Sequence, residues 1–226
     1  MAIYHCTAKI ITRSTGRSAV AAAAYRAGEK ITNEHDGRTH DYSRRHEIAY
    51  TEIMLPAHAP EAYRDRSTLW NAVEKSEKRK DSQLAREIEI ALPNELSRKE
   101  QIKLVQRYVK ENFVDKGMCA DIAIHTGQHR QKPSDTPKTD HDKELKPDNP
   151  HAHIMLTLRP IDQDGKWAAK SKDEYVLNKN GDRIKLKSGR WKSRKVDTTN
   201  WNQRETLLMW RENWAKAVNL ELEKKN

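Results

Sequence analysis

The sequence has very few cysteines and no long apolar run, and each absence excludes a class of protein. Cys6 and Cys119 are the only cysteines among 226 residues, too few for a disulfide framework. No apolar run is long enough for a signal peptide or a membrane span. We therefore expect a soluble, cytoplasmic protein.

Several catalytic patterns are absent as well. The chain contains no glycine-rich phosphate loop, no Cys-x-x-Cys pair and no serine nucleophile elbow. Acidic residues are in deficit, because 43 lysines and arginines stand against 33 aspartates and glutamates, a net charge of +10. An excess of positive charge favours a polyanionic partner such as nucleic acid.

The remaining pattern predicts one elaborated domain over residues 1–226, since 35% hydrophobic content can bury one core. Expected strands cover 3–10, 47–55, 84–92, 121–125 and 151–158, and expected helices begin at Ser18, at Asp65 or Ser67, at Ser97 with Glu100 as a capping box, and at Thr199. Polar stretches at 33–46 and 128–148 are expected to be loops. This order predicts an α+β fold, with helices covering one face of a sheet and the chemistry on the other.

The segment 149–158 carries a candidate metal site. Alternate side chains of a strand share one face, so His151 and His153 project together. His125 ends a similar apolar run, and a neighbouring strand could supply it as a third ligand. Three neutral imidazoles suit a divalent cation with an open position. For an isolated His-x-His pair, two surface histidines on an edge strand would be the better interpretation.

Tyr25 lies in an alanine-rich helix predicted over 19–27. Its neighbours one turn away are alanines and Gly28, so little side-chain bulk could cover the phenol. An exposed hydroxyl is what a nucleophile requires. The alternative is a tyrosine packed on the core, which would be the better interpretation without other evidence.

Two carboxylates are expected beside the histidines. Strand alternation over 84–92 places Glu87 and Glu89 on one face and the isoleucines between them on the other. A carboxylate there could serve as a general base, or it could orient a metal-binding histidine. The sequence leaves both roles open.

A basic β-hairpin is expected over 175–195, with Asn180-Gly181 as its turn. Its candidate nucleic-acid contacts are Arg183, Lys185, Lys187, Arg190, Trp191 and Lys192. An aromatic face among cations can stack on an unpaired base. The alternative is a solvated edge whose lysines prevent aggregation.

Four segments together resemble the MobA/MobL family of plasmid relaxases. They are Met1-Ala2-Ile3-Tyr4-His5, Gly16-Arg17-Ser18-Ala19 leading to Tyr25, Ala85-Arg86-Glu87-Ile88-Glu89-Ile90-Ala91-Leu92-Pro93, and Asn149-Pro150-His151-Ala152-His153. The resemblance spans nearly the whole chain. It implies a palm-like antiparallel sheet of the His-hydrophobe-His endonuclease type, and family members often continue into further domains.

The resemblance also implies an activity, nicking of one DNA strand at a plasmid origin of transfer through a 5′-phosphotyrosyl intermediate. By position, Tyr25 matches the nucleophile, the three histidines match the metal ligands, and Glu87 matches the acidic residue, with Glu89 as a less certain second candidate. The implied cofactor is one Mn²⁺ or Mg²⁺ ion. The implied partners are single-stranded or hairpin DNA and other transfer proteins.

Three other functions remain open. A rolling-circle replication initiator would use the same chemistry on a different DNA site. A noncatalytic nucleic-acid-binding protein would need only the basic hairpin, and its binding would survive loss of Tyr25. A structural zinc protein closed by histidines would unfold on chelation.

Overall fold

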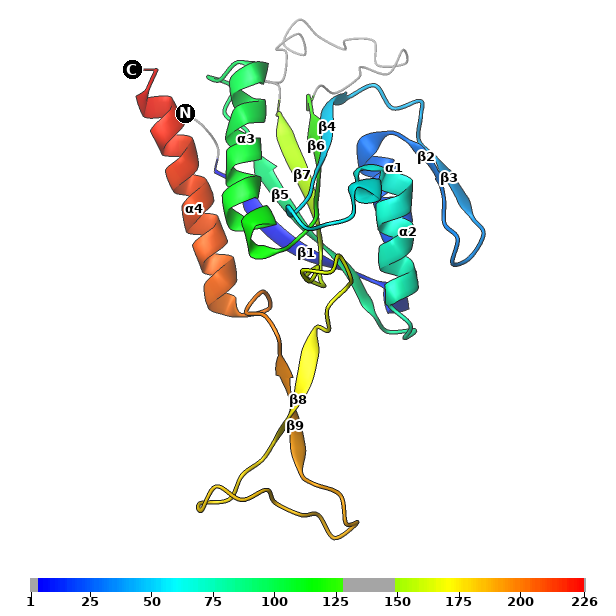
Figure 1. Cartoon of the computed structure of the whole chain (residues 1–226). Coiled ribbons are helices and arrows are strands. Elements are labelled where there is room, and N and C mark those ends of the chain that lie inside the picture. The colour runs from blue at the N-terminus through cyan, green and yellow to red at the C-terminus, as the bar shows by residue number, and fades with distance from the viewer. Residues whose placement is uncertain (1–3, 128–148, 226) are drawn as a thin grey trace, which may run out of the picture.

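The computed structural model describes residues 4–127 and 149–225. Its centre is an antiparallel sheet with strand order β1-β5-β7-β6-β4 (Figure 1). These strands are β1 (Cys6–Thr12), β4 (Ile48–Met54), β5 (Gln83–Ala91), β6 (Ala120–His125) and β7 (His151–Thr157). The α-helices are α1 (Ala19–Ala27), α2 (Arg66–Ser76), α3 (Arg98–Asn112) and α4 (Arg204–Glu223). The expected α+β fold with an antiparallel sheet is confirmed.

Each face of the sheet carries one pair of helices (Figure 1). Helices α3 and α4 bury Tyr108, Trp210 and Trp214 against one face, and the four-residue spacing of the two tryptophans puts both on the same side of α4. Helices α1 and α2 cover the other face, where Ala85 and Met155 are buried. The face that carries the histidines is thus also covered by helices. Its strands continue beyond the histidines with apolar side chains, and α1 and α2 bury these side chains.

Local capping signals account for most helix starts. The Ser18 side chain accepts a hydrogen bond from the Ala21 N–H, and Asp65 does the same for Thr68. The capping box of Ser97 and Glu100 is present at the start of α3. These predictions are confirmed.

The predicted start of the last helix at Thr199 is wrong. Helix α4 begins at Arg204, and Gln203 precedes it without a side-chain cap. The Gln203 N–H donates to the Asn200 carbonyl at 3.0 Å, and the Thr206 hydroxyl donates to the same carbonyl at 2.8 Å. This turn occupies the positions where an earlier helix would begin.

The predicted loop at 33–46 contains part of a small hairpin. Strands β2 (Lys30–Thr32) and β3 (Thr39–Asp41) pair from Lys30 with Asp41 to Thr32 with Thr39. Both strands are three residues long and mostly polar, so no apolar alternation announces them. The other predicted loop, 128–148, lies outside the described residues.

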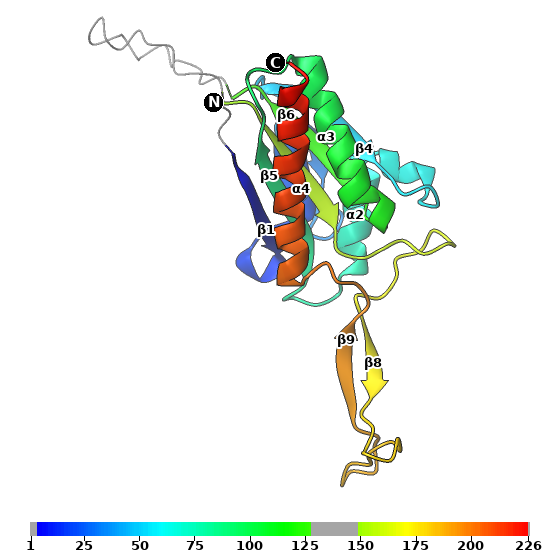
Figure 2. The same cartoon turned by 90° about the vertical axis from the view of Figure 1, so that its left-hand side faces the viewer.

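A two-stranded ribbon projects from the body of the protein (Figures 1 and 2). It pairs β8 (Ser171–Tyr175) with β9 (Ser193–Asp197). At the tip, single bridges join Leu177 to Arg183 and Lys185 to Trp191. A basic hairpin is thus present, but it differs from the predicted one over 175–195. Asn180-Gly181 forms only the turn of a small loop closed by the bridge between Leu177 and Arg183. The main strand pairing, between β8 and β9, overlaps only the two ends of the predicted range and extends beyond them.

Candidate active site

Neighbouring strands bring the three predicted histidines together. His125 and His151 are paired in register between β6 and β7, and His153 lies two residues further along β7. The ring centroids are separated by 4.9 Å for His125 and His153, 5.1 Å for His151 and His153, and 5.3 Å for His125 and His151. One ring nitrogen from each histidine lies within 4.8 Å of the others, close enough for all three to share a metal ion.

Each histidine also bonds to an oxygen outside this cluster. His125 Nε2 lies 2.8 Å from the Arg26 carbonyl, His151 Nδ1 lies 2.8 Å from the Asn149 carbonyl, and His153 Nδ1 lies 2.7 Å from Glu87 Oε1. A carbonyl or an ionised carboxylate accepts, so these nitrogens carry the proton. The other nitrogen of each ring keeps a lone pair. Metal-binding histidines have this arrangement, and the residues fit a divalent cation held by His125 Nδ1 and by Nε2 of the other two.

Burial keeps His125 neutral. Its side chain is almost completely buried, and burial lowers the pKa of His125 to about 4. A neutral imidazole is the form that binds a metal. No proton therefore has to leave His125 for binding near neutral pH.

Glu87 is a buried carboxylate held by two donors. It accepts from His153 Nδ1 and, at 2.5 Å, from Arg26 Nε. Burial alone would raise the pKa of Glu87, but the hydrogen bonds from His153 and Arg26 outweigh it and lower the pKa to about 2. Such a carboxylate stays ionised and is a weak base.

Glu89 faces the same side of the sheet but lies nearer the end of β5. Its carboxylate is 3.0 Å from the Lys9 ammonium and 3.7 Å from His5 Nε2, and it is partly open to solvent. One of its oxygens, one of Glu87 and a nitrogen of His153 lie within 4.8 Å of one another. Lys9 and Arg26 already balance these two carboxylates, so the histidine cluster is the better cation site.

Tyr25 lies in the last turn of α1 and is 46% exposed, in agreement with the small neighbours that the sequence places around it. The next residue connects this turn to the cluster. Arg26 accepts from His125 through its carbonyl and donates to Glu87 through its guanidinium. The structure therefore brings Glu87 and the three histidines together. Their contact with α1 is made by Arg26, and Tyr25 is the residue before it.

Sequence reasoning missed Arg26 and Arg45. The Arg45 guanidinium carbon lies 3.7 Å from the centroid of the Tyr25 ring, and Arg45 Nη1 donates to the Tyr25 carbonyl at 3.0 Å. Arg45 belongs to the segment that was expected to be a loop. Nothing in its local pattern distinguishes it from the exposed Arg44 beside it.

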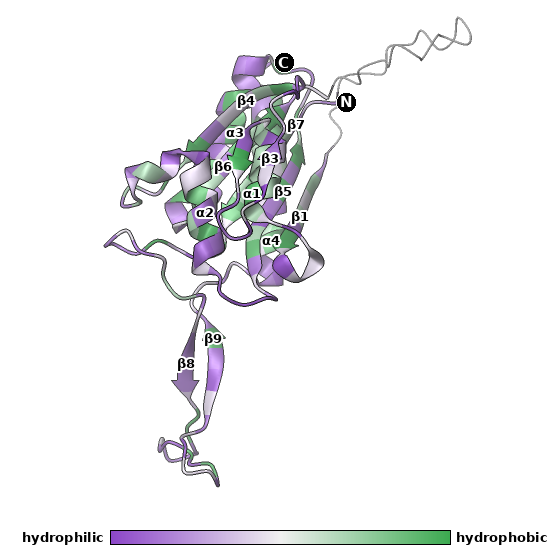
Figure 3. Cartoon of the chain, turned by 90° about the vertical axis from the view of Figure 1, so that its right-hand side faces the viewer, coloured by the Kyte–Doolittle hydropathy of each residue, from purple (hydrophilic) through white to green (hydrophobic). Residues whose placement is uncertain are grey.

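The six predicted nucleic-acid contacts gather at the ribbon tip and are exposed. The Lys185 ammonium lies 5.8 Å from the centroid of the Trp191 ring, which is 45% exposed. Strand β8 and much of β9 have the hydrophilic colour in Figure 3. The ribbon follows the end of β7 opposite His151, so the structure does not bring these residues to the histidines (Figure 1).

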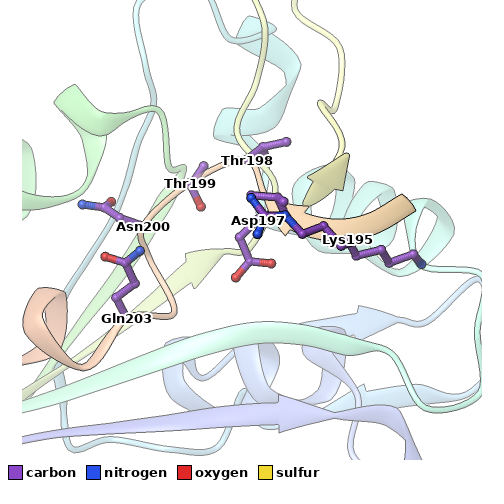
Figure 4. Close-up of a pocket in the computed structure, with 8 residues that line it drawn as sticks. Lys195, Asp197, Thr198, Thr199, Asn200 and Gln203 are labelled. Carbon is purple, nitrogen blue, oxygen red and sulfur yellow. The ribbon is translucent and has the colours of Figure 1, made fainter. Parts of the chain in front are cut away.

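An open polar depression of about 700 Å³ lies where β9 meets the start of α4. Figure 4 shows Lys195, Asp197, Thr198, Thr199, Asn200 and Gln203 among its lining residues. Thr199 thus lines this junction and does not cap a helix. In the described ranges, 4–127 and 149–225, no helix is both long and apolar enough to cross a membrane.

Comparison with known proteins decides the family. Residues 17–226 match the sequence profile of the MobA/MobL family. The chain belongs to the MobA/MobL family. The expectation from the four sequence segments is confirmed.

Several proteins are similar to the chain in sequence. It is 38% identical over 200 residues to "Conjugal transfer protein TraA" of Agrobacterium fabrum, a match that covers 84% of the chain and 16% of that protein. It is 33% identical to "Probable mobilization protein MobA" of Bifidobacterium longum, covering 99% of the chain and 39% of that protein. It is 39% identical to "Mobilization protein MobL" of Acidithiobacillus ferridurans, a match that covers 76% of the chain and 46% of that protein. The chain thus spans less than half of each of these relatives.

One solved structure matches the MobA/MobL chain over its whole length. It is described as "Molecular Basis of Vancomycin Resistance Transfer in Staphylococcus aureus". The TM-score is 0.76 at 30% sequence identity, and the match covers 100% of this chain and 95% of that one. The two proteins share the fold.

Proposed function

We propose that this chain nicks one strand of DNA at a plasmid origin of transfer, with Tyr25 as the nucleophile. The observation that carries the proposal is the cluster of three histidines, each with one nitrogen bonded to an oxygen and the other left for a cation, joined through Arg26 to the helix turn that carries Tyr25. Membership of the MobA/MobL family supports mobilisation as the setting and favours it over replication initiation.

The proposed reaction is a transfer between two oxygens. The phenolic oxygen of Tyr25 forms a bond to phosphorus as the bond from phosphorus to the 3′ oxygen breaks. The phenol loses its proton, the 3′ oxygen gains one, and the products are a 5′-phosphotyrosyl link and a free 3′-hydroxyl. Rejoining reverses these steps. The histidines would hold a divalent cation, Mn²⁺ or Mg²⁺, which when bound would supply positive charge that neutralises the phosphate.

Glu87 acts in this proposal by orienting His153. Two donors hold its carboxylate and the pKa lies at about 2, so it is poorly suited to accept the phenolic proton. As an acceptor for His153 Nδ1–H it fixes the tautomer that leaves Nε2 for the cation. Between the two roles that the sequence left open, these contacts favour orientation.

The ribbon tip is proposed to bind DNA outside the nick site. The five basic residues among the predicted contacts would bind phosphates, and Trp191 would stack on an unpaired base. Because His151 and His153 lie at the start of β7 and the ribbon follows its other end, the tip would reach nucleotides away from the scissile phosphate.

The decisive experiment is incubation with end-labelled single strands from a candidate transfer origin, with Mn²⁺ or Mg²⁺, followed by denaturing electrophoresis. We expect a protein-DNA adduct that survives denaturation. Tyr25→Phe should abolish the adduct and retain DNA affinity, because only the nucleophilic oxygen is removed. Tyr4→Phe is the matched control, since Tyr4 is similarly exposed at 53%. An adduct mapped to another tyrosine would refute the assignment.

A further inference from the structure

Arg45 holds Tyr25 from two directions. Its guanidinium carbon lies 3.7 Å from the ring centroid, and its Nη1 donates to the carbonyl of the same residue at 3.0 Å. A second ring lies beside it, because Tyr42 meets Tyr25 edge to face, with the ring centroids 5.2 Å apart and an angle of 89° between the ring planes. The Tyr25 side chain thus has a cation on one face and an aromatic ring against it.

The segment that supplies these contacts is itself fixed on α1. The Arg45 N–H donates to the Tyr42 carbonyl at 3.0 Å, which closes a turn. The Tyr42 N–H donates to the Glu29 carbonyl at 3.1 Å, just beyond the end of α1. Arg45 therefore approaches Tyr25 from a turn anchored to the same helix end.

Each guanidinium nitrogen of Arg45 already has a partner. Nε donates to Glu47 Oε1 at 2.6 Å, Nη2 pairs with the same carboxylate, and Nη1 bonds to the Tyr25 carbonyl. The side chain is 18% exposed, and its charge is balanced by Glu47. A guanidinium in this state is a poor phosphate contact. Its planar face, however, is free to lie on a ring.

We propose that Arg45, set in place by Glu47, is a positioning residue that holds the Tyr25 phenol in one orientation for attack. The inference rests on the proposed nucleophilic role of Tyr25. A half-exposed tyrosine at a helix end has several rotamers open to it, whereas in-line attack requires the oxygen in one place. Stacking beneath a fixed guanidinium restricts the ring, because cation–π contact favours one placement of it over the others.

The test compares four variants in single-turnover adduct formation with saturating single-stranded DNA from a transfer origin and Mn²⁺. Arg45→Ala and Arg45→Lys should each slow the adduct about ten- to a hundredfold, since a misplaced nucleophile costs rate and lysine lacks the planar face. Glu47→Gln should slow it less, because Arg45 remains but is less firmly held. Arg44→Ala, at the exposed neighbouring residue, should match the unmodified protein.

Two further readouts separate positioning from general damage. DNA affinity, measured for each change in a Tyr25→Phe background, should stay within about twofold, and the pH at half-maximal rate should not move. The Tyr25 ring signals in NMR spectra, identified by their loss in Tyr25→Phe, should shift in Arg45→Ala. Glu47→Gln provides the test if Arg45→Ala does not fold.

The outcomes are distinct. An unchanged rate in Arg45→Ala, or a full rate in Arg45→Lys, would overturn the positioning role. A shifted pH profile with the ring signals in place would also overturn it, because the guanidinium would then act through its charge. If the unmodified protein forms no adduct at Tyr25 under any of these conditions, the proposed function itself fails, and the role of Arg45 falls with it.

Discussion

Replacing Glu87 by glutamine tests whether this carboxylate orients a metal ligand. Glutamine has nearly the same shape, and its one remaining oxygen can accept from His153 or from Arg26 but carries no charge. In the native protein both donors bond to Glu87 Oε1, at 2.7 Å and 2.5 Å. The substitution therefore leaves the Arg26 guanidinium, 17% exposed, without its carboxylate.

Two magnitudes follow from these contacts. Loss of a partner that orients a metal-bound histidine typically weakens metal binding about 10- to 100-fold. Removing one member of a buried ion pair costs about 3 to 5 kcal/mol of stability. Because Arg26 retains some access to water, we expect a loss of stability at the lower end of that range.

The assay is calorimetric titration with Mn²⁺, together with thermal unfolding of the metal-free protein. Glu89→Gln is the matched comparison, because Glu89 lies on the same strand and face but pairs with Lys9 near solvent. Exposed ion pairs contribute about 0.2 to 1 kcal/mol to stability, so this variant should lose little stability. It should also bind Mn²⁺ almost as the unmodified protein does, because His153 Nδ1 bonds to Glu87 and not to Glu89. If Glu87→Gln folds and binds Mn²⁺ with unchanged affinity, Glu87 does not orient His153, and a shifted pH profile of adduct formation would then indicate a base.

Two other predictions follow. The metal-free protein should lose stability as the pH falls from about 6.5 to about 4, because His125, whose pKa burial lowers to about 4, stays neutral when folded while the unfolded chain takes up a proton. The loss of stability should continue below about pH 4.5, because the unfolded chain protonates Glu87 there, whereas in the folded protein His153 and Arg26 lower the pKa of Glu87 to about 2. Urea titrations that give a flat stability from pH 6.5 to 4 would contradict the assignment to His125. At the ribbon tip, neutralising Arg183, Lys185, Lys187, Arg190 and Lys192 should weaken binding to every DNA sequence and flatten the salt dependence by about 0.7 in log-log slope for each lost single-strand contact. Trp191→Ala should cost roughly 1 to 3 kcal/mol of binding free energy at unchanged slope, and fluorescence titrations at several salt concentrations that give native affinity for both variants would exclude a DNA-binding ribbon.

The parts of the fold that were predictable depend on neighbours in sequence. Ser18, Asp65 and the box at Ser97 cap helices through residues three positions away, so a local pattern is enough. The start of α4 was not predictable in this way. A threonine is an acceptable cap by type, but the turn closed at Asn200 leaves no helix for Thr199 to cap. Strand β3 was not predicted, because it is only three residues long and has no apolar alternation.

In the candidate site, too, the features set by local sequence were predictable and those set by distant residues were not. The alternation of strands predicts that His151 and His153 share a face, and that Glu87 and Glu89 share one. Only the register between β6 and β7 sets His125 opposite His151, and no residue near His125 in sequence encodes that register. Arg26 and Arg45 were missed because their partners lie 61 and 20 residues away. Local partners such as Glu47 for Arg45 hold these side chains, but the contacts that connect them to the site are tertiary.

The end of α1 explains why these contacts converge. A helix leaves its last four carbonyls without partners inside the helix. In α1 the Tyr25 carbonyl accepts from Arg45, and the Arg26 carbonyl accepts from His125. Gly28 ends the helix at φ 66°, and a Cβ there would lie 2.4 Å from a methyl carbon of Ile48 on β4, so the helix end lies tightly against the sheet.

One short turn therefore fixes both the proposed nucleophile and the proposed metal ligands. Its carbonyls anchor Arg45 on one side and His125 on the other, and the Arg26 guanidinium extends the connection through Glu87 to His153. A shift of this turn would move Tyr25 and disturb two of the three histidines together. The position of the Tyr25 backbone relative to the histidine cluster is thus set by backbone carbonyls and buried charged groups, which side-chain motion in the exposed ribbon cannot alter.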